Sequence, residues 1–277
     1  MELVRNKPLA VIMALYKNDC LEYVRLSVDS ILNQSFKDFD LYLQYDGPVA
    51  KEVDVYLSTI TDERLILHKR DENKGLAYSL NELLEIVYPK CYEYIARMDA
   101  DDISLPNRFE KQLDFLASNP EIDIVGGSVN EIDENGKDRN HVATYPTSPE
   151  DCVRFFSKRN PFAHPAVIFR RSFFEKTGCF YSTEYMRNED TSLWLEGFKK
   201  RIKGANLQDV VLNFRVTEEM FTQRRNGFEF ANSQLQLRKK IIKELGFGFM
   251  SYVYAYAMYL LMVSPSWILK IAYKVLR

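Results

Sequence analysis

Several features that define common protein classes are scarce or missing in this sequence of 277 residues. Its only cysteines are Cys20, Cys91, Cys152 and Cys179, and no two of them have the C-x-x-C spacing of a zinc or redox site. We therefore expect reduced thiols in the cytoplasm. The patterns G-x-x-x-x-G-K and G-x-G-x-x-G are both absent, which disfavours kinases, NTPases and dinucleotide-dependent oxidoreductases.

A strong charge of one sign is also missing. With 37 basic and 39 acidic residues the formal net charge is −2, which argues against a general nucleic-acid-binding protein. The total hides an asymmetry, because residues 238–277 hold seven basic side chains and one acidic one (+6), so residues 1–237 carry −8. An acidic body with a basic, aromatic-rich tail predicts contact with an anionic membrane surface.

The composition is that of a folded domain, with 46% hydrophobic and 27% charged residues. The apolar run at 9–15 is short and leads into Tyr16-Lys17-Asn18-Asp19, so it predicts a strand and a turn rather than a secretory signal. The length suits one large α/β domain with an appendage.

Strand and helix patterns alternate in the first hundred residues. Strands are predicted at 9–15, 39–45, 65–68 and 92–98, with helices at 21–32 and 76–87. Strands separated by helices predict right-handed βαβ crossovers, and therefore a parallel sheet with helices on both faces. In such sheets ligands lie at the carboxyl ends of the strands.

The pattern is less regular after residue 102. We expect a helix with Pro106 at its first position, strands at 122–129, 166–170 and 209–214, and a hairpin turn at 133–136. A further helix is expected at about 191–200, and the chain is predicted to be helical from Gly227 onward.

The most informative segment is Arg97-Met98-Asp99-Ala100-Asp101-Asp102, at the end of the fourth strand. Three carboxylates in four residues repel one another unless a cation lies among them, and Mg²⁺ or Mn²⁺ binds such groups together with substrate phosphates. Asp99 and Asp101 point to the same side in extended backbone, so one can hold a ribose while the other reaches the metal. The alternative is an acidic surface loop that caps the next helix.

These motifs resemble family 2 glycosyltransferases of the GT-A fold, in particular the bacterial polysaccharide and O-antigen members. The resemblance covers about residues 8–225 and includes Asp46-Gly47 after the second strand, Asn73-Lys74-Gly75 opening a helix, and the phrase at 96–108. It implies a Rossmann-like, mostly parallel sheet with flanking helices, followed by C-terminal amphipathic helices. The GT-A domain would span 1–226, with a nucleotide-sugar half at about 1–102, an acceptor half at 103–226, and a helical membrane-associating tail at 227–277.

The resemblance also implies roles for single residues on the donor side. The backbone of Ala14, Leu15 and Tyr16 would line the uracil and ribose pocket. Asp46 would bind uracil, and Lys74 would lie near the nucleotide. Asp101 would bind Mn²⁺ or Mg²⁺, and Asp99 would contact ribose or sugar and serve as a further metal ligand. Asp46 has the alternative of capping a turn, and Lys74 that of a solvated lysine. Asp102 would assist the site or cap the following helix.

On the acceptor side, Asn188-Glu189-Asp190 resembles the acidic motif that supplies the catalytic base. An inverting transfer needs one carboxylate to take the acceptor proton, and Asp190 is the first candidate and Glu189 the second. The alternative is a cluster that caps a helix, where acids are favoured. His164-Pro165 resembles the His-Pro that similar enzymes carry at the acceptor or diphosphate edge, and a purely structural histidine is the alternative. Arg215, Arg224 and Arg225 are predicted to contact the donor diphosphate or a lipid diphosphate, since arginine binds phosphate in a bidentate manner.

The resemblance implies an inverting, metal-dependent hexosyltransferase that moves glucose or galactose from a UDP-sugar, in a β-1,3 linkage, to GlcNAc-diphosphate-undecaprenol. It would act as a peripheral protein on the cytoplasmic face of the bacterial inner membrane, in O-antigen or surface polysaccharide assembly. The Q-x-x-R-W motif of processive synthases is missing, which favours transfer of a single sugar. A non-catalytic nucleotide-sugar-binding protein and a metal-dependent nucleotidyltransferase are the alternatives.

The tail has no charged side chain between residues 245 and 269. Its length would allow a membrane span, but its glycines, Pro265, four tyrosines and Trp267 favour helices that lie in the membrane interface. A helical cap packed on the body is the second alternative, and a true span is the third.

Overall fold

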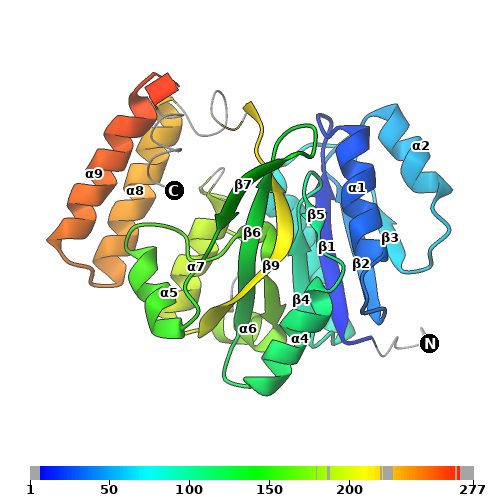
Figure 1. Ribbon diagram of the computed structural model, residues 1–277, viewed down its shortest axis with the longest axis horizontal. Coiled ribbons are helices and arrows are strands. Elements are labelled where there is room, and N and C mark those ends of the chain that lie inside the picture. The colour runs from blue at the N-terminus through cyan, green and yellow to red at the C-terminus, as the bar shows by residue number, and fades with distance from the viewer. Residues whose placement is uncertain are drawn as a thin grey trace.

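The computed structural model describes residues 7–178, 180–185, 188–218, 220, 227–265 and 267–268. Within these residues one sheet has the strand order β3-β2-β1-β4-β8-β6-β9-β5, and β7 pairs with β6 outside this path (Figure 1). The strands are β1 (Leu9–Leu15), β2 (Phe39–Tyr45), β3 (Leu65–His68), β4 (Tyr94–Met98), β5 (Ile103–Ser104), β6 (Ile124–Ile132), β7 (Asp138–Ala143), β8 (Ile168–Arg170) and β9 (Gly204–Arg215).

The helices cover both faces of this sheet. They are α1 (Leu21–Leu32), α2 (Lys51–Thr59), α3 (Leu76–Val87), α4 (Arg108–Ser118), α5 (Pro149–Phe156), α6 (Arg171–Thr177), α7 (Glu189–Lys199), α8 (Phe228–Glu244) and α9 (Phe249–Val263). Buried side chains of α1, α2 and α4 pack on one face, and those of α3, α5, α6, α7 and α8 pack on the other.

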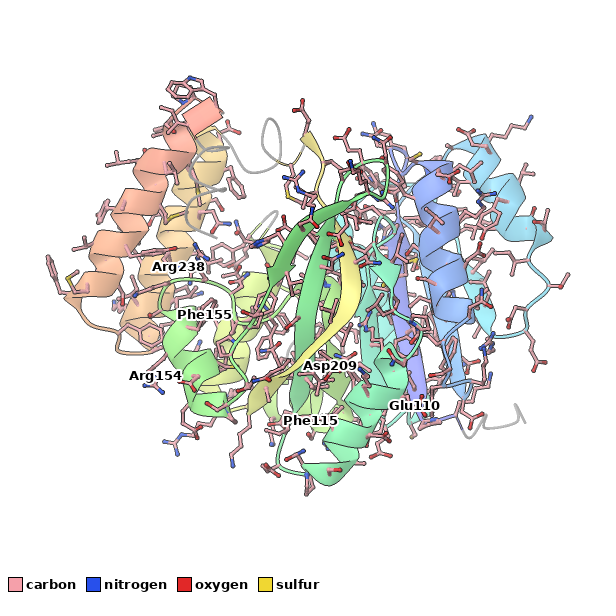
Figure 2. The ribbon with its side chains drawn as sticks, viewed as in Figure 1. Glu110, Phe115, Arg154, Phe155, Asp209 and Arg238 are labelled. Atoms are coloured by element: carbon pink, nitrogen blue, oxygen red, sulfur yellow. The ribbon has the colours of Figure 1, made fainter. Side chains whose placement is uncertain are left out.

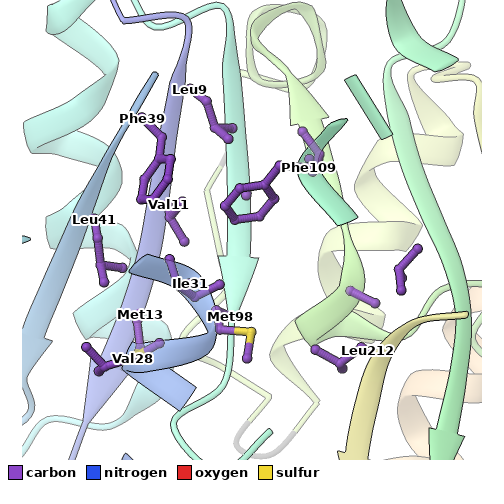
Figure 3. Close-up of a cluster of buried hydrophobic side chains, with 14 of the residues drawn as sticks. Leu9, Val11, Met13, Val28, Ile31, Phe39, Leu41, Met98, Phe109 and Leu212 are labelled. Atoms are coloured by element: carbon purple, nitrogen blue, oxygen red, sulfur yellow. The ribbon is translucent and has the colours of Figure 1, made fainter. Parts of the chain in front are cut away.

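Strand β1 has no alternation of polar and apolar residues, because both of its faces are buried. Leu9, Val11 and Met13 belong to the first core cluster, where Phe39 and Phe109 also pack (Figure 3), whereas Ala10 and Ile12 belong to the second cluster. Every one of these side chains is buried, because both faces of the strand are covered by helices.

The predicted α/β class with flanking helices is confirmed, but the sheet is parallel in its first half only. β1 is parallel to β2 and β4, and β2 is parallel to β3, but β8 runs antiparallel to both β4 and β6. The second half is therefore mixed, with β6 parallel to β9 and antiparallel to β7.

The bounds of the first three strands and of α1 and α3 agree with the sequence predictions. The predicted helix start at Pro106 is wrong: α4 begins at Arg108 with Asn107 as its N-cap, after a turn closed by the bond from the Arg108 N–H to the Leu105 carbonyl at 3.1 Å. Helices α2, α5 and α6 were not predicted.

The tail forms two helices that pack against each other at one end of the molecule (Figure 1). Leu237 and Ile241 of α8 are buried in the second core cluster, and Ala255 of α9 packs with Leu235 and Ile242 of α8. Among the residues described here, none of the helices combines the length and apolar character that a membrane crossing requires.

Candidate active site

Three parallel strands end side by side and bring the predicted donor residues together. β1 lies between β2 and β4, so Tyr16, Asp46 and Asp99, which follow these strands, share one edge of the sheet. Ala14 and Leu15 are the last residues of β1, and the Leu15 carbonyl accepts a hydrogen bond from the Asp46 N–H at 2.7 Å. This edge is where open α/β sheets bind ligands.

The Asp46 carboxylate holds the segment that opens α3. Its Oδ1 accepts a hydrogen bond from the Lys74 N–H at 2.8 Å, and its Oδ2 accepts one from the Gly75 N–H at 2.9 Å. The Arg70 guanidinium donates to Oδ1 as well and forms an ion pair with it. Asp46 therefore closes a turn, so a contact with uracil would have to be made in addition to these bonds.

Gly47 allows this turn to pack closely. Its φ is +79°, and a Cβ at this position would lie 2.8 Å from the Asn73 backbone nitrogen. The Asn73 side chain donates to the Asp46 carbonyl at 3.0 Å. Lys74, the next residue, has a partly exposed side chain whose Nζ lies 4.0 Å from the Glu72 carboxylate, so its place near a nucleotide remains a prediction.

Arg70 is a site residue that the sequence did not single out. Its side chain is mostly buried, and it donates to Glu82 at 2.6 Å, to the Glu72 carbonyl at 2.7 Å and to the Ser79 hydroxyl at 3.0 Å, besides its pairing with Asp46. No motif marks this arginine, because its partners come together only when the segment after β3 folds back onto the end of β2.

The carboxylates of Asp99, Asp101 and Asp102 converge after β4. One oxygen of each lies within 4.8 Å of the other two. Asp102 is buried, and its Oδ1 accepts a hydrogen bond from the Arg215 N–H at 2.8 Å, whereas its Oδ2 has no hydrogen-bond partner in the part of the chain that the structure describes.

The electrostatics of this cluster suit a divalent cation. Burial raises the pKa of Asp102 well above its ordinary value, and the charges of Asp101 and Asp99 raise it further. A cation with hard oxygen ligands would neutralise all three groups and use the orphaned Oδ2. The capping alternative is wrong for Asp102, because Asn107 is the N-cap of the next helix.

Two buried arginines lie beside the acid cluster. Arg97 of β4 is 1% exposed and forms an ion pair with Asp99 through Nη1. Arg215, at the end of β9, donates from Nε to the Asp101 carbonyl at 2.8 Å. Arg97 could have been noticed in the sequence as the one charged residue of an apolar strand.

The contacts of Arg215 differ from the predicted phosphate contact. Its Nη1 donates to the carbonyls of Asp133 and Glu134 at 3.1 Å, and its guanidinium lies 4.0 Å from the centre of the Tyr23 ring. Because Nε and Nη1 are bonded to backbone oxygens, Arg215 positions the Asp101–Asp102 turn, whereas its buried Nη2 has no hydrogen-bond partner among the described residues. A phosphate contact of Arg215 stays a prediction. Arg224 and Arg225 lie outside the described residues.

Helix α1 fixes the backbone around the same cluster. The Ser27 hydroxyl donates to the Asp99 carbonyl at 2.7 Å, and the Ser30 hydroxyl accepts from the Ser104 N–H at 3.0 Å. The fully buried Gln34 donates to the Leu105 carbonyl at 2.7 Å and accepts from the Phe109 N–H at 3.2 Å. The acid cluster thus lies on a loop that is held from several sides.

The second carboxylate pair lies in the first turn of α7, whose N-cap is the buried Asn188. Asp190 accepts hydrogen bonds from the Asn160 side chain at 2.8 Å and from the Thr191 N–H at 2.6 Å. Asn160 also donates to the Thr191 hydroxyl at 2.8 Å, so it fixes the start of the helix as well as the carboxylate. The sequence did not single out Asn160.

His164 and Tyr181 form a buried pair between the two groups of acids. The His164 Nε2 lies 2.8 Å from the Tyr181 hydroxyl oxygen. Burial, and then the charge of Arg97, lower the pKa of His164 well below its ordinary value, so the imidazole is neutral. Burial raises the pKa of Tyr181, and the charges of Asp190 and Asp99 both raise it further, so Tyr181 lies within electrostatic range of both.

Tyr181 is also tied to the donor side through its backbone. Asn81 of α3 accepts a hydrogen bond from the Tyr181 N–H at 2.8 Å and donates one to the Tyr181 carbonyl at 2.9 Å. The helix that follows the Asp46 turn therefore holds the segment that leads to Asp190.

Comparison with known proteins identifies the family of this chain. Residues 10–178 match the model of the family described as glycosyl transferase family 2. This chain is a family 2 glycosyltransferase. It is 34% identical over 242 residues to the amylovoran biosynthesis glycosyltransferase AmsE of Erwinia amylovora, covering 86% of this chain and 88% of the relative.

A second relative has a more detailed name. The UDP-Gal:alpha-D-GlcNAc-diphosphoundecaprenol beta-1,3-galactosyltransferase of Escherichia coli is 31% identical over 232 residues, which are 82% of this glycosyltransferase and 80% of the relative. Among solved structures, S. aureus TarS 1-349 in complex with UDP-GlcNAc has a TM-score of 0.65 at 14% identity, over 92% of this chain and 81% of that one. The latter likeness shows the shared GT-A fold.

Within this glycosyltransferase the two acid groups differ in position and neighbours. The cluster Asp99–Asp101–Asp102 follows β4 and lies against arginines, whereas Asp190 lies in the first turn of α7, a helix that contacts α6 and α8. A sugar nucleotide and an acceptor need such separate sites on the two sides of the reacting carbon.

Proposed function

We propose that this glycosyltransferase is an inverting enzyme that transfers glucose or galactose from a UDP-sugar to a lipid-diphosphate-linked sugar. The observation that carries the proposal is the pairing of an under-neutralised carboxylate cluster after β4 with a hydrogen-bonded Asp190 on α7, where Tyr181 lies within electrostatic range of both groups. The named activity of the Escherichia coli relative supports a UDP-sugar donor and a β-1,3 linkage to GlcNAc-diphosphate-undecaprenol.

The donor half, at about residues 1–102, would bind the nucleotide. We assign the backbone of Ala14, Leu15 and Tyr16 and the side chain of Asp46 to the uracil and ribose, and Lys74 to the edge of the nucleotide. Asp99 and Asp101, with Asp102 beside them, would hold Mn²⁺ or Mg²⁺. When bound, that ion supplies positive charge for the diphosphate as it departs.

The acceptor half, at about residues 103–226, would supply the base. Asp190 takes the proton of the acceptor hydroxyl while that oxygen forms a bond to the anomeric carbon from the face opposite the diphosphate. The bond from the anomeric carbon to the phosphate oxygen breaks, and its electron pair leaves with UDP. A single displacement of this kind converts an α-linked donor into a β-linked product.

Asn160 prepares Asp190 for this step because its amide fixes one carboxylate oxygen at 2.8 Å. Glu189, the neighbouring residue, is the second candidate for the base. The His164 ring is bonded to the Tyr181 hydroxyl, and its pKa is lowered by burial and by the charge of Arg97, so we assign it to the shape of the acceptor edge. Arg224 and Arg225 remain candidates for phosphate contacts.

We further propose that the protein is peripheral on the cytoplasmic face of the bacterial inner membrane, with residues 227–277 as the membrane-associating tail. The lipid-linked acceptor named for the Escherichia coli relative supports this location. Polysaccharide or O-antigen assembly, in which relatives take part by name, would then be the setting of the reaction.

The experiment that tests the proposal is sugar transfer to a synthetic GlcNAc-diphosphate-lipid with Mn²⁺, with UDP-glucose and UDP-galactose offered separately. We expect a β-linked disaccharide from one donor. Asp190→Asn should lose at least about a hundredfold in kcat while its affinity for UDP with Mn²⁺ stays within twofold, since general-base catalysis contributes roughly 10²–10⁴. Full activity of Asp190→Asn would contradict the base assignment, and an α-linked product would contradict inversion.

The same assay separates the alternatives. A non-catalytic nucleotide-sugar-binding protein would bind UDP-sugar and form no product with any acceptor. A nucleotidyltransferase would release pyrophosphate from UTP and a sugar phosphate, which family membership already disfavours.

A further inference from the structure

Helix α9 is apolar on the side that faces away from the protein. Its inward side packs on α8 through Ser251 and Ala255, which are buried. Its outward side presents a stripe of large apolar side chains at spacings of four and three residues, namely Phe249, Val253, Tyr256, Leu260 and Val263. Phe249 is 77% exposed and Leu260 is 65% exposed, and Trp267 beyond the helix is 62% exposed.

A surface helix of a soluble domain normally has polar residues on its outer face. Residues 249–263 contain no charged side chain, so both sides of α9 are apolar and the outer one lacks a partner among the described residues. Figure 1 shows α9 as the outermost helix, on the far side of α8 from the sheet. An uncovered apolar stripe of this length marks an interaction surface.

Positive side chains border this stripe on both flanks. On one side the Lys239 Nζ of α8 lies 4.9 Å from the centre of the Tyr256 ring. On the other side the Arg159 Nε donates to the Tyr254 hydroxyl at 3.3 Å. The 100° rotation per residue places Tyr254 and Tyr256 on opposite edges of the exposed face, so the two cations lie on opposite edges as well.

Negative charge is scarce around the stripe. The sequence has no acidic residue from 245 to 277, and Glu244 forms an ion pair with Lys199 at 2.8 Å. Arg238, labelled in Figure 2, does not join the border, because it reaches inward from α8 and donates to the Phe156 carbonyl at 2.7 Å. The surface is therefore an apolar stripe with a basic rim and tyrosines between the two.

We propose that this outward face of α9 docks in the plane of an anionic lipid bilayer, with Lys239 and Arg159 at the level of the headgroups. Apolar burial with flanking cations and tyrosines is the chemistry of an interfacial helix. This docking surface adds to the proposed membrane location the face of the protein that makes the contact, and it rests on that location.

A second copy of the chain fits this surface less well. Pairing two such faces about a two-fold axis would bring Lys239 and Arg159 of one copy toward the same cations of the other, and α9 itself carries no acid that could compensate them. Anionic phosphates match both rims at once.

The test is co-sedimentation of the full chain with vesicles of phosphatidylethanolamine and phosphatidylglycerol, compared with vesicles of phosphatidylcholine alone. We expect binding to the anionic vesicles, and a loss of at least tenfold in the double variant Phe249→Ser/Leu260→Ser. The matched control is Val55→Ser/Val142→Ser, which removes two exposed apolar residues of the body and should bind vesicles like the wild type. The variant Lys239→Gln/Arg159→Gln should lose the preference for anionic over neutral vesicles.

Binding of UDP with Mn²⁺ is measured for every variant and should stay within twofold of the wild type, which also shows that each variant is folded. Wild-type vesicle affinity in Phe249→Ser/Leu260→Ser would overturn the proposal. The proposal would also be overturned if the wild type were a dimer in sedimentation velocity, the Phe249→Ser/Leu260→Ser variant were a monomer, and neither protein bound vesicles. Vesicle binding as expected, without UDP binding or sugar transfer, would instead contradict the proposed function and leave the docking surface standing.

Discussion

Asp46 and Asp102 lie near the ends of two strands that flank β1, yet their surroundings are opposite. The Asp46 carboxylate accepts hydrogen bonds from two backbone N–H groups and from Arg70, so its charge is compensated within the protein. Asp102 has one such bond, an orphaned Oδ2 and two more carboxylates within 4.8 Å. The first carboxylate holds a loop in place, whereas the second is kept in an unfavourable state that a ligand would relieve.

Removal of the Asp46 carboxylate, whose charge is compensated within the protein, should have the largest effect on stability. In Asp46→Ala the Arg70 guanidinium, which is 11% exposed, loses its ion pair, and two N–H groups lose their acceptor. We expect a loss of about 3 kcal/mol in the free energy of unfolding. This is the low end of the range for breaking a buried ion pair, because Arg70 retains its ion pair with Glu82. Urea unfolding followed by circular dichroism measures it, and a loss below about 1 kcal/mol would contradict the role of Asp46 as a clamp.

Removing a carboxylate from the uncompensated site should affect ligand binding and leave stability unchanged. Asp101→Ala should weaken the affinity for UDP in the presence of Mn²⁺ at least a hundredfold, about 2.8 kcal/mol. The thermal midpoint should stay nearly unchanged. Titration calorimetry with and without Mn²⁺ checks this, and normal Mn²⁺-dependent binding by the variant would show that the metal assignment is wrong.

The neutral His164 should make stability depend on pH. Its pKa is lowered by burial and by Arg97, so the unfolded chain binds the proton more readily, and the free energy of unfolding falls as the pH drops below about 6.5. Between pH 7 and pH 5 this contribution reaches up to about 2 kcal/mol, if one pH unit corresponds to about 1.4 kcal/mol. His164→Gln should flatten this part of the profile; an unchanged slope between wild type and variant would mean that the pKa of His164 is the same in the folded and the unfolded chain.

The smallest expected effect is an increase in stability. Asp102→Asn keeps an acceptor for the Arg215 N–H and removes a buried charge beside two others. We expect the metal-free protein to be stabilised by about 1 kcal/mol, a rise of roughly 2–4 °C in the thermal midpoint.

The sign of its pH dependence follows from the raised pKa of Asp102. In the wild type the ionised carboxyl costs stability at high pH, and this cost disappears as the pH falls through the raised pKa. The advantage of Asp102→Asn should therefore be larger at pH 8 than at pH 5. A variant that is less stable than the wild type at both pH values would contradict the idea that the cluster is under-neutralised.

The alternation of apolar strands and helices in the first hundred residues was enough to predict β1, β2, β3, α1 and α3 with their bounds, because both faces of a parallel sheet are buried and the pattern is local. The acidic motif at 99–102 could be recognised for the same reason, since its members are neighbours in the chain. Short helices such as α6 escaped prediction because seven residues give too few turns for a periodic signal.

What the sequence alone determined is therefore the fold class, the family resemblance and the carboxylates that follow each other along the chain. The tertiary structure alone decided which distant groups they meet: Arg70 with Asp46, Arg215 under the Asp101–Asp102 turn, Asn160 with Asp190, and Tyr181 between the acids. It also decided that α9 keeps an apolar face uncovered. The physical reason is that these contacts depend on the relative placement of elements far apart in the chain, which no local pattern of residues encodes.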